Sequence, residues 1–534
     1  MMNIAMNRFL IGMAALLMVT AGHAEDITIR FDGTTAQVKQ EVKDSVNVTV
    51  EGAHVSINST YQAHKLTVRL KGQSDDGQLI LKTAGKAQVK LDGLNLTSQE
   101  GAPLWLKNQK KVEIKAVNGT KNKLTITACN DTANHKAATI WAKGKLLFSG
   151  KGTLDVEATG DGCRGIKAKK DITIEELTLN VFTKGNHLGE KPFGMGGFGG
   201  GPMGGMPQFN PDDLPEEVKK QFEEKHKEME EMMKNGEFPM GGFGGPFGGM
   251  RPERNDSTRQ GGFPGHAEGG FPAFGNHEDG EGSPMGGFGG KHKYIAATKG
   301  IASKGKIIIN SGDVFVRTIT AGAEGIEGKE GVILNGGRVF SWAVDDAINA
   351  NAAIEFNGAN VVAQSTANDA VDANLGGFFM PFGMGNQNQE KEQEPAIIIT
   401  AGTVYAWSEI GAPEEGLDCD FSPIEISGGN VFSVGAGIGD MPSVPTNSTA
   451  KQPTVLLVGI DIFENQPIQL YDSKGKLLDT ITVPFSLQRS SSLLSNEHFQ
   501  MGETYTVKTT HYEKAEEKTY EKTFTLNENF TIVR

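Results

Sequence analysis

The chain has 534 residues, more than a single compact core usually holds, unless the fold is a repeat in which each unit contacts only its neighbours. Its formal net charge of -13 at pH 7 disfavours nucleic acid and anionic membranes as partners and favours cations. Three cysteines, Cys129, Cys163 and Cys419, lack the spacing of a zinc site and form an odd set, so we expect buried free thiols rather than a disulfide framework.

The first 24 residues have the pattern of a secretory signal peptide. Arg8 precedes an apolar run from Phe9 to Val19, and the small residues that end at Ala24 predict cleavage before Glu25. The residue directly after this site is not a cysteine, so a lipobox anchor is not expected. No later run is long and apolar enough to span a membrane. The sequence therefore predicts an exported protein that is secreted, periplasmic or at the cell surface.

Residues 25–186 are predicted to form the N-terminal coils of a repeat protein. Strand-like runs at 46–50, 66–70 and 88–91 alternate with Gly and Asp turns and are typical of entry coils with a cap. Four-residue phrases then recur in one register, and they are Leu104-Trp105-Leu106-Lys107, Ile140-Trp141-Ala142-Lys143, Ile166-Lys167-Ala168-Lys169 and Ile301-Ala302-Ser303-Lys304. Their first residues predict an aliphatic column in the core.

Residues 187–290 interrupt this pattern with Phe-Gly-Gly and Met-Gly-Gly tracts, which predict a disordered insertion from one coil turn. Within it, residues 213–234 carry Glu and Lys at helical spacing, which favours a short solvated helix. His226 and Met232 there fit a charged surface helix better than a metal site. A second Gly/Phe/Met-rich tract lies at 376–386, and self-association through such loops is a further expectation.

Residues 291–445 contain the clearest repeat. Its first half is an acidic phrase, found as Glu324-Gly325-Ile326-Glu327, Asp346-Ala347-Ile348-Asn349, Asp369-Ala370-Val371-Asp372 and Glu415-Gly416-Leu417-Asp418. Its second half is Gly-x-Val-aromatic or a relative of it, found at 337–340, 359–362, 402–405 and 429–432. A period of about 20 to 25 residues built from β-branched strands and Gly/Asn turns predicts an all-β parallel solenoid.

Residues 450–534 lose the period. Strand-like runs at 455–458, 468–471, 504–507 and 524–526 are joined by turns such as Ser473-Lys474-Gly475. We expect a small antiparallel β module that caps the solenoid, because an open coil end would leave backbone groups unpaired.

Stacked coils would align the acidic phrases into columns of like charge. Two carboxylates about 5 Å apart repel by roughly 3 kcal/mol at an effective dielectric constant near 20, so protons, interleaved Asn or Lys, or bound cations must offset the repulsion. Oxygen ligands of this type favour Ca²⁺. The candidate metal ligands are Glu324, Glu327, Asp345, Asp346, Asp369, Asp372, Glu415 and Asp418. The alternative is that these side chains only satisfy turn backbone groups.

Strand alternation predicts a second surface beside the acidic columns. If the Val of each Gly-x-Val-aromatic phrase points inward, the outward residues offer rings and polar groups to a sugar chain. The candidate carbohydrate-binding residues are Arg317, Trp342, Gln364, Tyr405 and Trp407. The alternative is that these aromatic residues pack against an outer layer.

The Asp-Ala-Ile/Val phrases at 346–348 and 369–371, the Gly/Phe/Met-rich interruptions and Gly502-Glu503-Thr504-Tyr505 together resemble the exported carbohydrate-binding domain-containing family. The resemblance covers roughly residues 40–510. It implies a right-handed parallel β-helix similar in fold to pectate lyases, and calcium-associated binding of acidic polysaccharide such as polygalacturonate. It does not imply catalysis.

Two other functions stay open at this point. A calcium-dependent lyase would need a Lys or Arg base, for which Lys299, Lys304, Lys329 and Arg338 are available without a motif that marks any of them. A structural or adhesive surface protein would instead use its Gly/Phe-rich loops for self-association. We expect the non-catalytic, polysaccharide-binding function.

Overall fold

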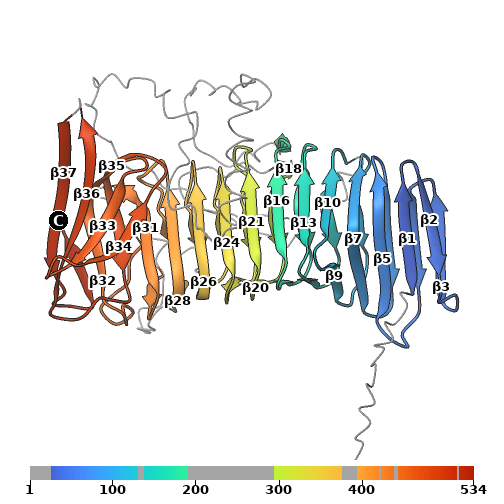
Figure 1. Ribbon diagram of the computed structural model, residues 1–534, viewed down its shortest axis with the longest axis horizontal. Helices are drawn as coiled ribbons and strands as arrows, with labels where there is room; N and C mark the ends of the chain where they lie inside the picture. Colours follow the sequence, from blue (N-terminus) through green and yellow to red (C-terminus); the bar gives the residue numbers. More distant parts are fainter. Residues whose placement is uncertain are drawn as a thin grey trace, which may run out of the picture.

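The computed structural model describes residues 26–129, 137–190, 294–375, 394–419, 422–437, 443–513 and 516–534. Within these ranges every regular element is a strand, and none is a helix that could cross a membrane. The strands stand side by side along one long axis, from β1 to β37 in nearly sequential order (Figure 1). The predicted all-β class is confirmed for this part of the chain.

One sheet of eleven strands contains the repeating four-residue phrases. Its strands are β3 (Val46–Glu51), β4 (His54–Ser59), β6 (Gln78–Thr83), β8 (Leu104–Leu106), β11 (Ala138–Ala142), β14 (Arg164–Ala168), β19 (Ile301–Ser303), β22 (Ile326–Gly328), β25 (Ile348–Ala350), β27 (Val371–Ala373) and β29 (Leu417–Asp418). From β4 onward every neighbouring pair is parallel. Each strand therefore belongs to the next coil of the chain.

A second sheet of 21 strands contains the rest of each coil in two parallel tracks. One track holds β9 (Val112–Ala116), β12 (Leu146–Ser149), β15 (Ile172–Ile174), β20 (Ile307–Ile309), β23 (Val332–Leu334) and β30 (Ile424–Ile426). The other holds β10 (Lys121–Ile126), β13 (Thr153–Ala158), β16 (Thr178–Thr183), β21 (Asp313–Thr318), β24 (Arg338–Ala343) and β31 (Asn430–Gly437). Four long strands run through both tracks, namely β5 (Leu66–Ser74), β7 (Ala87–Ser98), β26 (Ile354–Ser365) and β28 (Ile397–Ser408).

The core lies between these sheets and is built from aliphatic columns. The predicted column is confirmed: Leu104, Ile140, Ile166, Ile301, Ile326, Ile348, Val371 and Leu417 are paired in register and at most 2% exposed. Glycine is required where one track bends into the next. Gly337 has φ 84°, and a Cβ there would lie 2.4 Å from the Gly312 carbonyl oxygen of the preceding coil.

Both ends of the coils are closed by antiparallel pairs. At the N-terminal end β1 (Ile27–Asp32) pairs with β2 (Thr35–Gln40), and β3 pairs with β4. At the C-terminal end β35 (Leu487–Ser495) runs antiparallel to the last coil strand β31, and it is joined in the large sheet by β32 (Thr454–Ile462) and β38 (Phe530–Val533). At the C-terminal end these strands cover the β31 edge of the large sheet, whereas β29 is the last strand of the eleven-stranded sheet.

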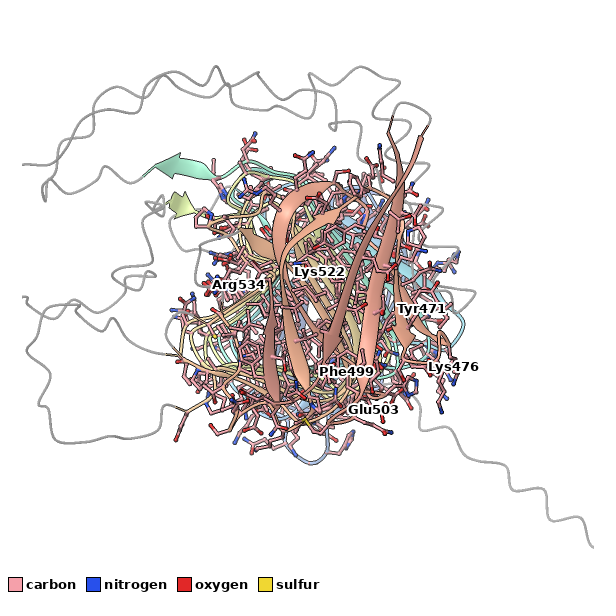
Figure 2. The ribbon with its side chains drawn as sticks, turned by 90° about the vertical axis from the view of Figure 1, so that its left-hand side faces the viewer. Tyr471, Lys476, Phe499, Glu503, Lys522 and Arg534 are labelled. Atoms are coloured by element: carbon pink, nitrogen blue, oxygen red, sulfur yellow. The ribbon has the colours of Figure 1, made fainter. Side chains whose placement is uncertain are left out.

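A separate antiparallel sheet has the order β34 (Leu477–Thr482), β33 (Pro467–Asp472), β36 (Thr504–Glu513) and β37 (Glu516–Thr525). Figure 2 looks onto this end of the molecule, with Tyr471, Lys476, Phe499 and Lys522 labelled on it. The C-terminal segment is thus part independent sheet and part continuation of the large sheet.

Several sequence-based expectations lie outside the described residues. They are the signal peptide 1–24, the insertion except its edges, the helix at 213–234 and the tract at 376–386. The edges of the insertion are described, since β17 (Leu188–Glu190) and β18 (Tyr294–Ala296) pair antiparallel. Cys129, Cys163 and Cys419 form no disulfide, and Cys163 and Cys419 are buried while Cys129 is half-buried.

Candidate functional site

Two acidic columns run along the eleven-stranded sheet in the register that the repeat predicts. The second acidic column consists of Glu327, Asn349, Asp372 and Asp418, which are direct partners in β22, β25, β27 and β29. The first acidic column consists of Glu324, Asp346, Asp369 and Glu415, each three residues earlier in the same phrase. The two residues between the columns in the middle coils, Ala347 with Ile348 and Ala370 with Val371, belong to the hydrophobic core, whereas the column members do not. Most members are nevertheless buried, with Asp346 1% and Asp369 8% exposed.

Lys299 closes the N-terminal end of both columns. Its Nζ lies 2.9 Å from Glu324 Oε2 and 2.6 Å from Glu327 Oε1, and Lys329 also pairs with Glu327. Burial alone would lower the pKa of Lys299, but the two glutamates raise it above its ordinary value. Burial would likewise raise the pKa of Glu327, but the two lysines hold it well below its ordinary value.

The lysines offset the effect of burial on the pKa less for Glu324 than for Glu327. Burial raises its pKa, and the neighbouring charge of Glu327 raises it further despite the contact with Lys299. We infer that Glu327 holds the negative charge that Lys299 balances. Glu324 is then the member of the pair that takes up a proton first.

Asparagine amides separate the carboxylates in the middle of the columns. Asn349 Nδ2 donates to Asp346 Oδ2 at 2.6 Å and to Asp372 Oδ2 at 2.9 Å. Asn368 Nδ2 donates to Asp345 Oδ1 and Asp346 Oδ1, both at 2.6 Å. Even so, burial and the charges of Asp345 and Asp372 raise the pKa of Asp346 well above its ordinary value.

The C-terminal end of the columns brings together Asp369, Glu415 and Asp418, with Glu414 beside them. Asp369 accepts the backbone N–H of Glu415, yet burial and the charge of Asp418 raise its pKa to about 9. Burial and Asp418 also raise the pKa of Glu414. Ser443 donates its backbone N–H to Glu415 and its hydroxyl to Asp418 Oδ1 at 3.0 Å. Backbone and hydroxyl groups thus hydrogen-bond to these carboxylates, and the raised pKa values favour the protonated forms of Asp369 and Glu414.

The donor set of this end fits Ca²⁺ in chemistry. Within the part of the chain that the structure describes, no three His, Cys, Asp or Glu side chains converge closely enough to hold a metal ion by themselves. Calcium, however, also takes backbone carbonyl and water oxygens. Burial and the charge of Asp418 raise the pKa of Asp369 and so favour a proton on its carboxylate. A bound cation would neutralise the same charge in place of that proton.

The predicted outward aromatic surface is covered. Phe340, Val362, Tyr405 and Phe432 do alternate with the inward valines, but they join a second hydrophobic cluster with residues of the C-terminal strands, such as Val455, Leu470, Val483 and Tyr505. Tyr405 is 4% and Trp407 2% exposed, and Gln364 is buried with its amide 2.6 Å from Glu409 Oε1. This differs from the exposed sugar-binding face that we expected, because the C-terminal strands form an outer layer over it.

Arg317 and Trp342 are the two carbohydrate-binding candidates at the edge of the outer layer that the C-terminal strands form. They are direct partners in β21 and β24, and both are half-buried. The Arg317 guanidinium lies 5.1 Å from the Trp342 ring centroid. This cation–π pair keeps some exposed surface, unlike Tyr405 and Trp407.

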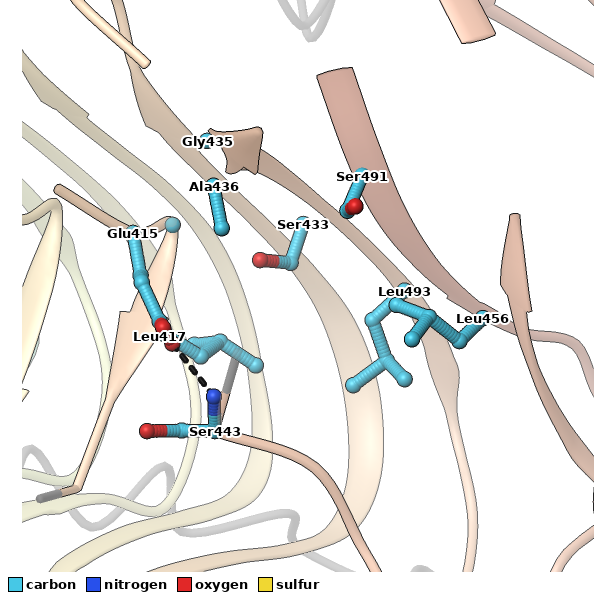
Figure 3. A pocket seen from close by; sticks show the side chains of 10 residues that line it. Glu415, Leu417, Ser433, Gly435, Ala436, Ser443, Leu456, Ser491 and Leu493 are labelled. Atoms are coloured by element: carbon cyan, nitrogen blue, oxygen red, sulfur yellow. Dashed lines mark hydrogen bonds between the residues drawn. The ribbon is translucent and has the colours of Figure 1, made fainter. Parts of the chain in front are cut away.

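A small pocket lies at the C-terminal end of the acidic columns. Figure 3 shows Glu415 reaching the backbone nitrogen of Ser443 at one side, with Ser433 and Leu493 at the other. Its cavity volume of about 10 Å³ is enough for one water molecule and too small for a sugar ring. Binding of a glycan would therefore need an open face rather than this pocket.

Sequence reasoning missed a basic column on the N-terminal half of the same sheet. One register position holds a lysine in six successive coils: Lys82 within β6, and Lys107, Lys143, Lys169, Lys304 and Lys329 directly after the strands of the next five coils. Asn351 and Asn374 continue this basic column into the acidic half. The signal was present for four of the six, since Lys107, Lys143, Lys169 and Lys304 are the last residues of the four-residue phrases, which we used only to set the register.

An aromatic pair lies beside the basic column. Trp105 and Trp141 are direct partners in β8 and β11, with ring centroids 6.5 Å apart and an edge-to-face arrangement. Lys107 Nζ lies 3.6 Å from the Trp105 centroid, and Lys169 Nζ lies 6.0 Å from that of Trp141. One sheet thus changes from aromatic and basic to acidic along its length.

Comparison with known proteins gives a match on the N-terminal coils. Residues 51–191 match the model of a family described as "Carbohydrate-binding domain-containing protein". A curated protein of that description from Acetivibrio thermocellus is 28% identical over 145 residues, which are 26% of this chain and 50% of the relative. The chain spans about half the length of that relative. The family match covers the tryptophan pair and four of the six column lysines, and it ends before the acidic columns.

A solved structure described as the polysaccharide lyase-like protein from C. thermocellum, as a gadolinium derivative, is also similar to this chain. The sequence identity is 16%, and the alignment covers 63% of this chain and 90% of that chain. The TM-score is 0.34.

Proposed function

We propose that this protein is an exported, non-catalytic polysaccharide-binding protein that recognises acidic glycans such as polygalacturonate with bound calcium. The observation that carries the proposal is the match of residues 51–191 to a carbohydrate-binding family. The rest of the proposal is supported by the long stack of coils, whose side chains recur along one direction and so suit an extended polymer better than a small ligand. Export is supported by the N-terminal signal pattern in the sequence.

We further propose that the stacked tracks form a right-handed parallel β-helix. The support is the parallel pairing of each coil with the next over nine strand pairs of the eleven-stranded sheet. Right-handed crossovers between parallel strands are the general rule in proteins.

Calcium enters the proposal at the C-terminal end of the acidic columns. The ligands would come from among Asp369, Glu415 and Asp418, completed by backbone carbonyl and water oxygens. Asp372 and the other candidate ligands contact asparagine amides or lysines instead. When bound, the ion would supply positive charge for the carboxylates of a uronate glycan. The support is the pKa of Asp369, which burial and Asp418 raise to about 9, since a cation relieves the same repulsion as a proton.

The ion pairs made by three of the four candidate bases disfavour a lyase activity. A general base must lose its proton near the working pH. Lys299 is held in ion pairs that raise its pKa, Lys329 pairs with Glu327, and Arg338 pairs with Asp313 at 2.7 Å. Three of the four candidates are therefore poor proton acceptors.

The proposal is tested by calorimetric titration of the mature protein with oligogalacturonate and with its methyl-esterified form, in calcium and in chelator. We expect binding of the acidic glycan, tighter in calcium, and weaker binding of the ester. Incubation with polygalacturonate should release no unsaturated uronate that absorbs in the ultraviolet. Failure to bind either glycan in both buffers would refute the polysaccharide-binding function.

A further inference from the structure

The basic column places like charges at a spacing that is unfavourable by itself. Neighbouring strands lie about 4.8 Å apart, so equivalent lysines in successive coils have closely spaced backbones. Two ammonium groups at about that distance repel by roughly 1 kcal/mol even in water. Six in a row form a linear field of positive charge on a protein whose net charge is -13.

Anionic side chains do not neutralise the middle of this column. Among the ion pairs within the described residues, none involves Lys143, Lys169 or Lys304, and all three side chains are exposed. The nearby Asp171 is engaged by Lys145 at 2.7 Å. The acidic half differs, since Lys299 and Lys329 there are paired with glutamate. The middle lysines thus keep their charge for another partner.

The tryptophan pair restrains lysines without removing their charge. Lys107 lies over Trp105, and Lys169 lies over Trp141 one coil further on. A cation–π contact holds an ammonium group in place and leaves it cationic, and it is worth about 0.5–1 kcal/mol at an exposed site. Restraint of flexible side chains before binding lowers the entropy that binding must overcome.

We propose that a linear acidic polysaccharide binds along the basic column, across the strands, with its carboxylates paired to lysines of successive coils. This site rests on the proposed function and gives it a location that needs no calcium. A regular row of cations complements a polymer whose anionic groups recur along one direction. The location agrees with the family match, which contains Lys82, Lys107, Lys143 and Lys169.

The test uses the mature protein with three column lysines neutralised together, K143Q, K169Q and K304Q. The matched control is K121Q, K151Q and K184Q, which removes equal charge from exposed lysines on the side of the 21-stranded sheet. Oligogalacturonate, its methyl ester and a DNA oligonucleotide are titrated calorimetrically in chelator. We expect the column variant to lose at least 10-fold in affinity for oligogalacturonate, with a shallower salt dependence, and the control to lose less than 3-fold.

The outcomes separate this site from the general function. If wild type binds oligogalacturonate and both variants match it, the basic column is not the site, while polysaccharide binding stands. If wild type binds neither glycan in chelator or in calcium, the proposed function fails and the site with it. Tighter binding of the oligonucleotide than of oligogalacturonate, lost in the column variant, would overturn the acidic polysaccharide as occupant. Equal thermal unfolding of the variants confirms that they are folded.

Discussion

The two halves of the eleven-stranded sheet share one backbone and carry opposite side chains. In the N-terminal half, Trp105, Trp141 and exposed lysines occupy the outward positions. In the C-terminal half, the positions equivalent to the tryptophans hold carboxylates and Asn349, most of them buried, and the positions equivalent to the lysines hold Lys329, Asn351 and Asn374. A repeat therefore fixes the positions of the side chains, while the charge at each position can differ from coil to coil. The basic half leaves its charge in solvent, whereas the acidic half must balance its charge inside the protein.

The largest difference in stability is expected between substitutions of Lys299 and Lys304, which lie where the two halves meet. Lys299→Ala removes the cation that two buried glutamates share, so the free energy of unfolding should fall by about 3–5 kcal/mol. Lys304→Ala, five residues later and exposed, should change it by less than about 0.5 kcal/mol. Urea denaturation followed by circular dichroism measures both. Equal losses in the two variants would contradict the balance of charge described for Lys299.

The acidic half should make stability depend on pH in an unusual direction. Asp369 has a pKa of about 9 in the folded protein against an ordinary value of 3.8, so between these values the folded state binds more protons than the unfolded state. Its contribution is therefore fully present below about pH 4 and is lost as the pH rises towards 9. The slope is at most about 1.4 kcal/mol per pH unit for one such site.

Glu327 acts in the opposite sense, because Lys299 and Lys329 lower its pKa below the ordinary value of 4.5. Its contribution is present above that value and is lost as the pH falls below it. We expect maximal stability in chelator at mildly acidic pH. Urea midpoints measured from pH 4 to pH 9 test this, and Asp369→Asn should flatten the alkaline side. A midpoint that rises from pH 6 to pH 9 would contradict the raised pKa of Asp369.

A smaller effect separates calcium binding from turn chemistry at the same residue. Asp369→Asn keeps the acceptor for the Glu415 backbone N–H and removes one repelling charge, so in chelator at pH 8 the variant should be more stable than wild type by about 1 kcal/mol. Wild type should then gain more stability on addition of calcium than the variant does. Calorimetric titration with calcium provides the direct measurement, and identical affinities would remove Asp369 from the metal site.

The sequence was sufficient for the coils because their signal is local and repeated. One aliphatic residue per coil, glycine at the bends and a period of about 20 to 25 residues predict the register that pairs Ile326 with Ile348 and Val371. The same register placed Glu327, Asn349 and Asp372 in one column. Four of the six lysines of the basic column were equally readable, since Lys107, Lys143, Lys169 and Lys304 each end a four-residue phrase. A common surface residue attracts no notice, however, until the coils are stacked.

The sequence by itself determined the all-β class, the core column and the order of charges along each column, because these follow from strand alternation and a fixed repeat. Tertiary structure decided which outward surfaces remain open. Tyr405 and Trp407 have the same alternation as an exposed aromatic face, yet the C-terminal strands cover them. It also decided how Lys299 divides its charge between two glutamates. Both outcomes depend on contacts between segments far apart in the chain, and a local sequence pattern does not contain those contacts.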